Sequence, residues 1–318
     1  MKNVLVLIPL NEAQKARLEA LGPDCSFRYT DGAEPDAAQV QAANIIIGFP
    51  SPAKIAASEN LEFLQLSSSG ADAYVKPGVL RPGTVLCSVT GAYGQAVGEH
   101  AFAMTWELLK KLHLYRDDQA KEIWGDRGTV GTLRGATVVV VGLGDIGSEY
   151  ARLVKAVGAR VIGVKRRPSA CPDFVDELCL TEDLDRVLPE ADVVCSILPG
   201  TASTYHLFNK ERFAKMKPSA IFINCGRGTA LDAEALCSAL DRGVIAAAGA
   251  DVTEVEPLPA GHPLWKQPNM VITPHISGGW HLPVTLERIV EICFANFEAY
   301  LKGDELQNVI DFQTGYKK

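Results

Sequence analysis

The chain has 318 residues, which is enough for two ordinary domains. Hydrophobic residues make up 47% and charged residues 22%, a balance that indicates a globular protein with a sizeable core and excludes a disordered chain. The net charge of −7 argues against a nucleic-acid-binding surface, and no apolar stretch approaches the roughly 18–20 residues that span a bilayer.

The first segment alternates predicted strands with a predicted helix. Its apolar start runs into an amphipathic helix at 12–21 without a cleavage pattern, which predicts a buried strand and not a targeting segment. Strands are expected at 4–8, 45–48, 63–66 and 84–88. Because nearly continuous apolar strands indicate a parallel sheet that is covered on both faces, this segment is predicted to be an α/β unit.

A second α/β series follows one long helical pattern that runs from Ala96 towards Gln119. After Pro283 another helix, at 284–301, leads to a short tail. The strands of the second series are predicted at 137–141, 160–164, 192–197, 220–224, 245–250 and 270–273, and its helices at 146–157, 210–216 and 233–241.

The last helix and the tail are too short to form a domain, so we expect them to return to the first unit. The predicted domains are therefore a discontinuous substrate domain, 1–92 with 283–318, and a cofactor domain, 93–282. We expect a ligand cleft between them, at the carboxyl ends of the strands.

The segment Gly142-Leu143-Gly144-Asp145-Ile146-Gly147 joins a strand of valines to a helix. In a G-x-G-x-x-G turn the first glycine allows the tight bend, the second lets the backbone approach a pyrophosphate, and the third lets helix and strand pack closely. The helix N-terminus offers free N–H groups to the phosphates. A tight turn without a ligand is the alternative, but the flanking strands and helix favour dinucleotide binding.

The next strand ends in the cations Lys165, Arg166 and Arg167. A carboxylate at this place would bind a free ribose 2′-hydroxyl, whereas planar guanidinium groups suit a 2′-phosphate. We therefore predict NADP(H) as the cofactor. NAD is the alternative if the basic turn is merely solvated.

Four motifs occur in a fixed order, at 142–147, 223–228, 250–258 and 273–279. Together they resemble the D-isomer-specific 2-hydroxyacid dehydrogenase family, and the likeness covers nearly the whole chain. The fold that this implies is two doubly wound parallel-sheet domains, a Rossmann cofactor domain and a smaller flavodoxin-like substrate domain. Because the basic turn is similar to that of the NADP-using reductases of the family, glyoxylate and hydroxypyruvate are the leading substrates.

The resemblance implies that Arg227, Glu256 and His275 are catalytic. Reducing a 2-keto acid places negative charge on the C2 oxygen, and a histidine can supply the proton while a carboxylate stabilises its imidazolium form. A guanidinium can fork onto the substrate carboxylate and keto oxygen. Glu254 is an alternative to Glu256, but the Pro257-Leu258 that follows favours Glu256. Taken alone, each of these three residues could have a purely structural role. The order of the four motifs favours a catalytic one.

Further cofactor contacts are implied by the same resemblance. Asp251 should contact the nicotinamide carboxamide or its ribose, and Gly278 should lie beside that ring. The loop with Leu198 and Pro199 should cross the cofactor, and Thr204 should contact a ribose or a phosphate.

The loop at 69–71 is predicted near the substrate, and Cys225 near the cofactor. Backbone N–H groups of Ser69, Gly70 and Ala71 are expected to receive the substrate carboxylate, with a plain strand-end turn as the alternative. Cys225 stands two residues before Arg227 and is counted among the cofactor contacts; of a thiol-sensitive role and a small buried side chain, we favour the second.

The sequence thus predicts an NADP(H)- or NAD(H)-dependent oxidoreductase that acts on a small D-2-hydroxy or 2-keto acid, in the first place a glyoxylate or hydroxypyruvate reductase. The alternatives are an enzyme like phosphoglycerate dehydrogenase and a non-catalytic, cofactor-sensing binding protein. Formate dehydrogenase chemistry is disfavoured, since that relative has glutamine where Glu256 lies.

The eight cysteines are scattered, and none forms a C-x-x-C pair. They predict reduced thiols in a cytoplasmic enzyme without a metal site. A homodimer is expected because the family commonly pairs its subunits, and neither a nucleic acid nor a membrane is expected as a partner.

Overall fold

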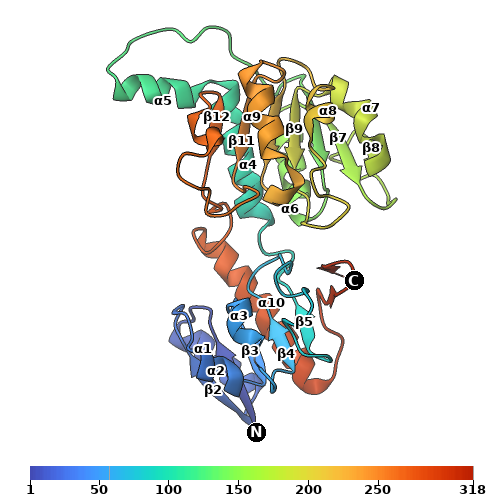
Figure 1. Ribbon diagram of the computed structural model, residues 1–318. Helices are drawn as coiled ribbons and strands as arrows, with labels where there is room; N and C mark the ends of the chain where they lie inside the picture. Colours follow the sequence, from blue (N-terminus) through green and yellow to red (C-terminus); the bar gives the residue numbers. More distant parts are fainter. Residues whose placement is uncertain (57, 318) are drawn as a thin grey trace. The chain divides into compact units, whose positions relative to one another are not determined.

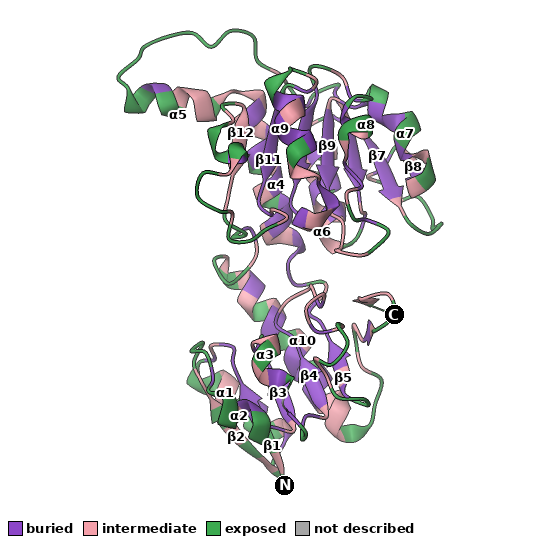
Figure 2. Ribbon diagram, viewed as in Figure 1, coloured by how far each residue is buried: buried purple, intermediate pink, exposed green. Residues whose placement is uncertain are grey.

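The computed structural model describes residues 1–56 and 58–317. The chain divides into two compact units, one of Met1–Ala92 with Gly279–Lys318 and one of Tyr93–Gly278 (Figure 1). Each unit is built on a parallel sheet, of five strands in the first and seven in the second, so the predicted class of two parallel-sheet α/β domains is confirmed. Figure 2 shows that the strands of both sheets are largely buried.

The first unit has the strand order β2-β1-β3-β4-β5. The inner strands are short apolar runs, Ile45–Ile47 being three isoleucines with no exposed surface, because helices cover both faces of the sheet. The strands are β1 (Lys2–Val6), β2 (Cys25–Tyr29), β3 (Ile45–Ile47), β4 (Phe63–Gln65) and β5 (Val85–Cys87), and the helices are α1 (Glu12–Leu21), α2 (Ala37–Ala42), α3 (Pro52–Ile55) and α10 (Pro283–Lys302).

The C-terminal helix α10 returns to this first sheet through a buried pair of amides. Asn296 on α10 donates from Nδ2 to Oε1 of Gln65 on β4 over 2.7 Å, and its Oδ1 accepts from the backbone of Gln307 over 2.8 Å. Buried polar groups need such partners, so the pair fixes where α10 lies on the sheet. A small hairpin of β13 (Ile310–Asp311) and β14 (Tyr316–Lys317) follows.

The second unit has the strand order β12-β11-β10-β9-β6-β7-β8. Its strands are parallel, but successive strands are added on one side of β6 from β7 to β8 and on the other side from β9 to β12. Such a reversal of strand order creates the crevice where open α/β sheets bind their ligands. The strands are β6 (Thr137–Val141), β7 (Arg160–Lys165), β8 (Glu177–Leu180), β9 (Val193–Ser196), β10 (Ile221–Asn224), β11 (Ala247–Ala250) and β12 (Met270–Ile272).

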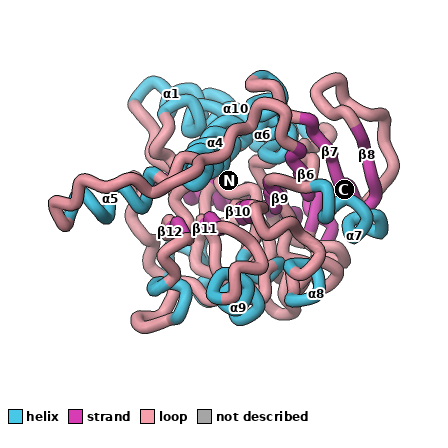
Figure 3. Tube along the Cα trace, turned by 90° about the horizontal axis from the view of Figure 1, so that it is seen from above, coloured by secondary structure: helices cyan, strands magenta, loops and turns pink. Residues whose placement is uncertain are grey.

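Helices cover both faces of the second sheet. Figure 3 shows α4 and α6 on one side of the strands and α8 and α9 on the other. Along β6, Val139 packs into the cluster on the α9 side while Val140 faces α6, so both faces of the strand are apolar. The helices are α4 (Gly94–Leu109), α5 (Leu112–Ala120), α6 (Asp145–Ala156), α7 (Leu184–Val187), α8 (Lys210–Phe213) and α9 (Ala233–Asp241), with 3-10 turns η1 (Thr181–Asp183), η2 (Leu188–Glu190), η3 (Gly228–Ala230) and η4 (Pro263–Lys266).

The prediction of one continuous helix from Ala96 towards Gln119 was wrong. Lys111 has a φ of +58°, in the left-handed region, which an α-helix cannot pass through, so α4 ends at Leu109 and α5 starts afresh at Leu112. The chain that follows α5 returns to this break, where Nζ of Lys110 donates to the carbonyl of Gly131 over 2.8 Å. In the part of the chain that the structure describes, no helix is long and apolar enough to cross a membrane.

Candidate active site

The three predicted catalytic residues follow three neighbouring strands of the second sheet. Arg227 comes after β10, Glu256 after β11 and His275 after β12, and these strands are adjacent and parallel. The glycine turn follows β6 at the same edge of the same sheet. Parallel strands end together, so the topology gathers these segments from distant parts of the sequence along one edge.

His275 and Glu256 are in direct contact. The imidazole Nδ1 lies 2.7 Å from Oε2 of Glu256, and the other carboxylate oxygen accepts from the backbone N–H of Thr253 over 3.0 Å. The side chains are 49% and 37% exposed, so the pair is open to a ligand. A carboxylate on Nδ1 fixes the ring orientation and leaves Nε2, which has no hydrogen-bond partner among the described residues, to exchange a proton.

The loop that carries His275 is folded around the carboxylate of Asp251, which is 2% exposed. Its Oδ1 accepts from the hydroxyl of Thr273 and from the backbone of Ile276, and its Oδ2 accepts from the backbone and hydroxyl of Ser277. His275 itself donates from its backbone to the Asp251 carbonyl over 2.7 Å and has a left-handed φ of +53°. Asp251 therefore holds the residues on both sides of the imidazole.

His100 on α4 extends this network. Its Nε2 lies 3.0 Å from the Thr273 hydroxyl and 3.8 Å from Oδ1 of Asp251. The helix is thereby tied to the loop that carries His275, which adds a polar contact to the apolar packing of α4 on the sheet.

Arg227 lies between two glycines that cannot be replaced without moving backbone. A Cβ at Gly226 would lie 2.4 Å from the backbone nitrogen of Leu198, and one at Gly228 would lie 1.9 Å from the carbonyl oxygen of Thr253. The Asn224 side chain braces the turn, because its Nδ2 donates to the Arg227 carbonyl over 3.1 Å. The sequence around Arg227 thus brings the loops after β9, β10 and β11 into backbone contact.

The glycine turn has the geometry that a dinucleotide needs. Gly142 has a φ of +103°, and a Cβ there would lie 2.4 Å from the Ile197 carbonyl; a Cβ at Gly147 would lie 1.9 Å from the Gly142 carbonyl. Gly144 is exposed at the N-cap of α6 with no side-chain cap, which leaves the N–H groups of that helix end for an anion. These residues fit a bound pyrophosphate.

Asp145 does not turn its carboxylate into this phosphate turn. Its Oδ1 lies 2.4 Å from the position of a Cβ on Gly94, so the side chain faces the start of α4. The backbone of Asp145 and of Ile146, which is half-buried, forms the first turn of α6. The negative charge is therefore compatible with the predicted phosphate site.

The basic turn after β7 leaves two guanidinium groups available. Lys165 donates to the hydroxyl of Ser169 over 2.9 Å. Arg166 and Arg167 are exposed, and within residues 1–56 and 58–317 neither has an ion-pair partner. Such cations fit a 2′-phosphate on the adenosine ribose.

The part of the chain that carries these residues is similar to a known family of enzymes. The model of the "D-isomer specific 2-hydroxyacid dehydrogenase, NAD binding domain" matches residues 102–277.

The chain belongs to the D-isomer specific 2-hydroxyacid dehydrogenase family.

A family protein from Aeromonas salmonicida has a solved structure that superposes with a TM-score of 0.83 at 32% identity, covering 98% of this chain and 99% of that one. The NADPH-dependent glyoxylate/hydroxypyruvate reductase of Sinorhizobium meliloti, solved with NADP and sulfate, superposes with a TM-score of 0.82 at 25% identity, covering 99% of this chain and all of that one. Glyoxylate/hydroxypyruvate reductase B of Escherichia fergusonii is 44% identical over 181 residues, 56% of this chain and 54% of that relative. The prediction of a nicotinamide-dependent dehydrogenase is confirmed.

Within this dehydrogenase, several predicted cofactor contacts also have internal roles. The Thr204 hydroxyl lies 2.6 Å from the carbonyl of Pro199, so it folds its own loop, in which Leu198 is half-buried. Burial raises the pKa of the Cys225 thiol well above its ordinary value, which favours a small packed side chain over a reactive thiol. Gly278 packs against the ring of Tyr93, with 3.3 Å from its Cβ position to Cδ1.

The predicted substrate loop belongs to the first unit. The hydroxyl of Ser68 donates to the carbonyl of Gly70 over 2.8 Å, and Ala71 is buried. The backbone N–H groups of Ser69, Gly70 and Ala71 donate to no acceptor in the described part of the chain. Such a row of N–H groups suits an anion.

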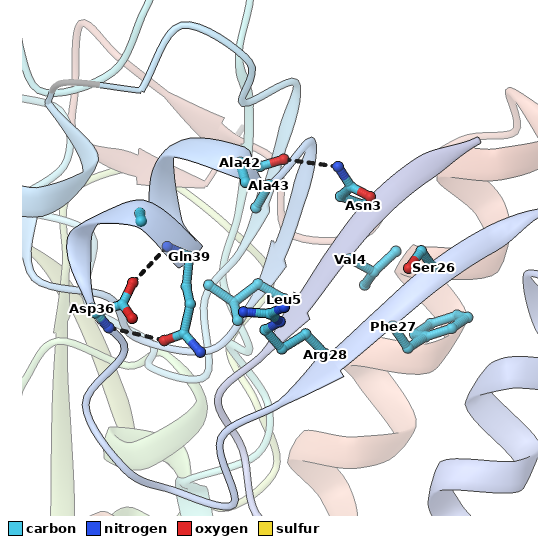
Figure 4. A pocket seen from close by; sticks show the side chains of 11 residues that line it. Asn3, Val4, Leu5, Ser26, Phe27, Arg28, Asp36, Gln39, Ala42 and Ala43 are labelled. Carbon is cyan, nitrogen blue, oxygen red and sulfur yellow. Dashed lines mark hydrogen bonds between the residues drawn. The ribbon is translucent and has the colours of Figure 1, made fainter.

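A separate depression of about 310 Å³ lies in the first unit, over β1 and β2 beside α2 (Figure 4). Asp36 and Gln39 exchange hydrogen bonds of 2.7 and 2.9 Å, and Asn3 donates to the Ala42 carbonyl, so these polar groups serve the start and end of α2. Arg28 is its remaining charged group and is exposed. None of the residues that line the depression is a predicted catalytic, cofactor or substrate contact.

Sequence reasoning missed the residues that support the imidazole and the carboxylates. Thr273 and Ser277, which hold Asp251, lie inside the 273–279 motif but were given no role, since hydroxyl residues in loops are common. Tyr205 and His206 both contact Glu254. The available signal for His206 was a histidine two residues after the predicted cofactor contact Thr204.

Proposed function

We propose that this dehydrogenase reduces glyoxylate or hydroxypyruvate to the corresponding 2-hydroxy acid, with NADPH as the preferred cofactor. The observation that carries the proposal is the 2.7 Å contact between His275 and Glu256 at the sheet edge that also holds Arg227 and the glycine turn. The substrate assignment is supported by the relatives from Escherichia fergusonii and Sinorhizobium meliloti, whose names give this activity.

In the proposed reaction Arg227 binds the substrate carboxylate and opposes the negative charge that develops on the keto oxygen. His275 donates a proton to that oxygen from Nε2, and Glu256 stabilises the imidazolium form through Nδ1. The nicotinamide dinucleotide supplies the hydride for C2. In the reverse direction His275 takes the proton back.

The cofactor contacts are part of the same proposal. The unpaired guanidinium groups of Arg166 and Arg167 support binding of a 2′-phosphate, and with it the preference for NADPH over NADH. The residues proposed to contact the cofactor are Gly142, Gly144, Asp145, Ile146, Gly147, Lys165, Arg166, Arg167, Leu198, Pro199, Thr204, Cys225, Asp251 and Gly278. Ser69, Gly70 and Ala71 remain proposed contacts of the substrate carboxylate, which is supported by their unused N–H groups.

We also propose a homodimer in the cytoplasm. Large apolar side chains are exposed on α5 and on the chain that follows it, with Trp124 fully exposed and Leu112 at 53%, and these side chains would gain from burial against a second subunit. All eight cysteines are free thiols, which supports a reducing compartment. Sedimentation of the purified protein tests the dimer.

The decisive assay is NADPH oxidation with a panel of 2-keto acids, repeated with NADH. We expect the highest kcat/KM with glyoxylate or hydroxypyruvate and NADPH. Phosphohydroxypyruvate as the best substrate would instead assign a phosphoglycerate-dehydrogenase-like activity. Cofactor binding without turnover of any acid in the panel would reject the enzyme in favour of a cofactor-sensing protein.

A further inference from the structure

A second histidine–glutamate pair shares the loop after β11 with the first, because Glu254 stands two residues before Glu256. Oε1 of Glu254 lies 2.9 Å from Nε2 of His206 and accepts from the Tyr205 hydroxyl over 3.1 Å. The two rings stack with their centroids 4.0 Å apart and their planes 12° from parallel. Accepting the hydrogen bond, Glu254 raises the pKa of Tyr205.

His206 stands where three loops meet. It follows β9, its backbone N–H donates to the carbonyl of Thr229 in the loop after β10 over 2.8 Å, and its ring holds Glu254 in the loop after β11. Its φ of +46° is left-handed, a conformation that is uncommon outside glycine and in which asparagine, aspartate and histidine are enriched. The loops after β10 and β11 are those that carry Arg227 and Glu256.

The side chains of Glu254 and Glu256 extend from one tight turn towards different partners. Within this turn the Thr253 backbone donates to Glu256, and the Thr253 hydroxyl donates to the carbonyl of Val255 over 2.8 Å. The two carboxylates are two residues apart, and each is bonded to a different histidine: Glu254 to His206, and Glu256 to His275. A shift of this turn would therefore move Glu256 relative to the imidazole of His275.

We propose that His206 and Tyr205 are positioning residues that act through Glu254: by holding that carboxylate they keep Glu256 on Nδ1 of His275. This rests on the proposed function, since it assigns a purpose to the place of Glu256. His206 and Glu254 are each 30% exposed, and a pair so open to solvent adds little to stability. The consequence of losing it lies in the orientation of His275 and in turnover, with the fold unchanged.

The first test reads the tautomer of His275 without any catalysis. The chain has six histidines, so imidazole ¹⁵N spectra can be assigned by single substitutions. In the wild type at neutral pH we expect His275 to carry its proton on Nδ1, facing Glu256. In His206→Asn, which tolerates the left-handed backbone but is too short to reach Glu254, we expect a mixture of tautomers, and in His206→Gln a return towards the wild-type spectrum.

Glu254→Ala removes the acceptor and leaves the left-handed residue in place, so it decides the question if His206→Asn unfolds. It should shift the His275 signals as His206→Asn does, and the double variant should be no worse than either single one, because all three lose the same contact. Lys155→Ala, which breaks the exposed pair with Asp176 elsewhere in the same unit, is the matched control and should leave the spectrum unchanged.

The second test is kinetic. For His206→Asn and Glu254→Ala we expect kcat to fall roughly three- to tenfold through misplacement of the acid–base pair, with the KM for NADPH changed less than twofold. A wild-type His275 spectrum in Glu254→Ala would overturn the proposal. Absence of turnover in the wild type would instead contradict the proposed function, while the tautomer of His275 would still decide the positioning role.

Discussion

The two halves of the carboxyl edge in the second sheet are built in different ways. Beyond β10, β11 and β12 the functional side chains are held by one another: Asp251 accepts four hydrogen bonds from the loop of His275, and Glu256 contacts the imidazole. Beyond β6 and β7 the structure offers backbone N–H groups and solvated cations.

The proposed function accounts for this difference. Groups that move a proton work only in one geometry, so their orientation has to be fixed before the substrate arrives. Cations that select a 2′-phosphate gain their partner on binding, and until then water solvates them at little cost. Substitutions in the first half should therefore affect turnover and stability, and those in the second half cofactor affinity.

The largest effect is expected for His275→Ala. Removing the proton donor should lower kcat by roughly 10²–10⁴-fold, the usual contribution of a general acid, and leave the NADPH dissociation constant nearly unchanged. Steady-state turnover with glyoxylate and NADPH titration by fluorescence measure the two. His262→Ala, in the same unit, should keep full activity; a normal rate for His275→Ala would refute the acid–base role.

Asp251→Ala sharpens the comparison, because the same residue should matter for stability and for turnover. A buried carboxylate that accepts several hydrogen bonds is worth about 2–4 kcal/mol, so the free energy of unfolding should fall by that amount, and kcat should fall at least tenfold as the His275 loop loosens. Urea unfolding and initial rates test this. Asp241→Ala, at an exposed residue that bonds Gln267, should change neither. If the rate held, the loop would be folded independently of Asp251.

Substitutions in the basic turn after β7 should change the KM for the cofactor. Arg166→Ala combined with Arg167→Ala should raise the KM for NADPH at least tenfold, with little change for NADH, because two charge-assisted phosphate contacts are lost and solvent screening leaves only part of the about 1.5–3 kcal/mol of each. The loss should shrink in high salt. Arg242→Ala is the control for removing an exposed guanidinium. Equal changes for both cofactors would mean that the basic turn does not select the phosphate.

The smallest effect is predicted for thiol reagents. Burial raises the pKa of Cys225, so its thiol stays protonated at pH 8 and is shielded, whereas Cys171 is exposed. Brief alkylation of the native enzyme at pH 8 should label Cys171 first and leave activity intact, as peptide mass spectrometry and an assay can show. Inactivation that parallels labelling of Cys225 would place a reactive thiol beside Arg227.

Much of the fold was predictable because its strands are buried on both faces. The valines of β6 and the isoleucines of β3 give continuous apolar runs that indicate parallel strands. Within the two parallel sheets, the strands that escaped prediction are β2 and β8, which are edge strands beside β1 and β7 and whose half-exposed, mixed sequences carry a weaker signal. The helix break at Lys111 was not predicted because the residue in the left-handed conformation is a lysine, and no glycine marks the position in the sequence.

The candidate site was predictable as far as its motifs reach. The glycines of the phosphate turn follow from a local pattern, the candidates Arg227 and His275 follow from motifs that resemble the family, and the common place of these segments at one sheet edge follows from the parallel topology. The Pro257-Leu258 that follows favoured Glu256 over Glu254, but the sequence does not show which histidine each carboxylate contacts, His206 or His275. Such pairings depend on how loops pack, which a single sequence does not encode locally.

The central claim is that Arg227 and His275 act on the same substrate. The most direct measurement is a crystal structure with NADP⁺ and oxalate, an unreactive analogue of glyoxylate. We predict that oxalate accepts hydrogen bonds from the Arg227 guanidinium and from Nε2 of His275, with Glu256 still on Nδ1. Oxalate bound with neither side chain in contact would contradict the account.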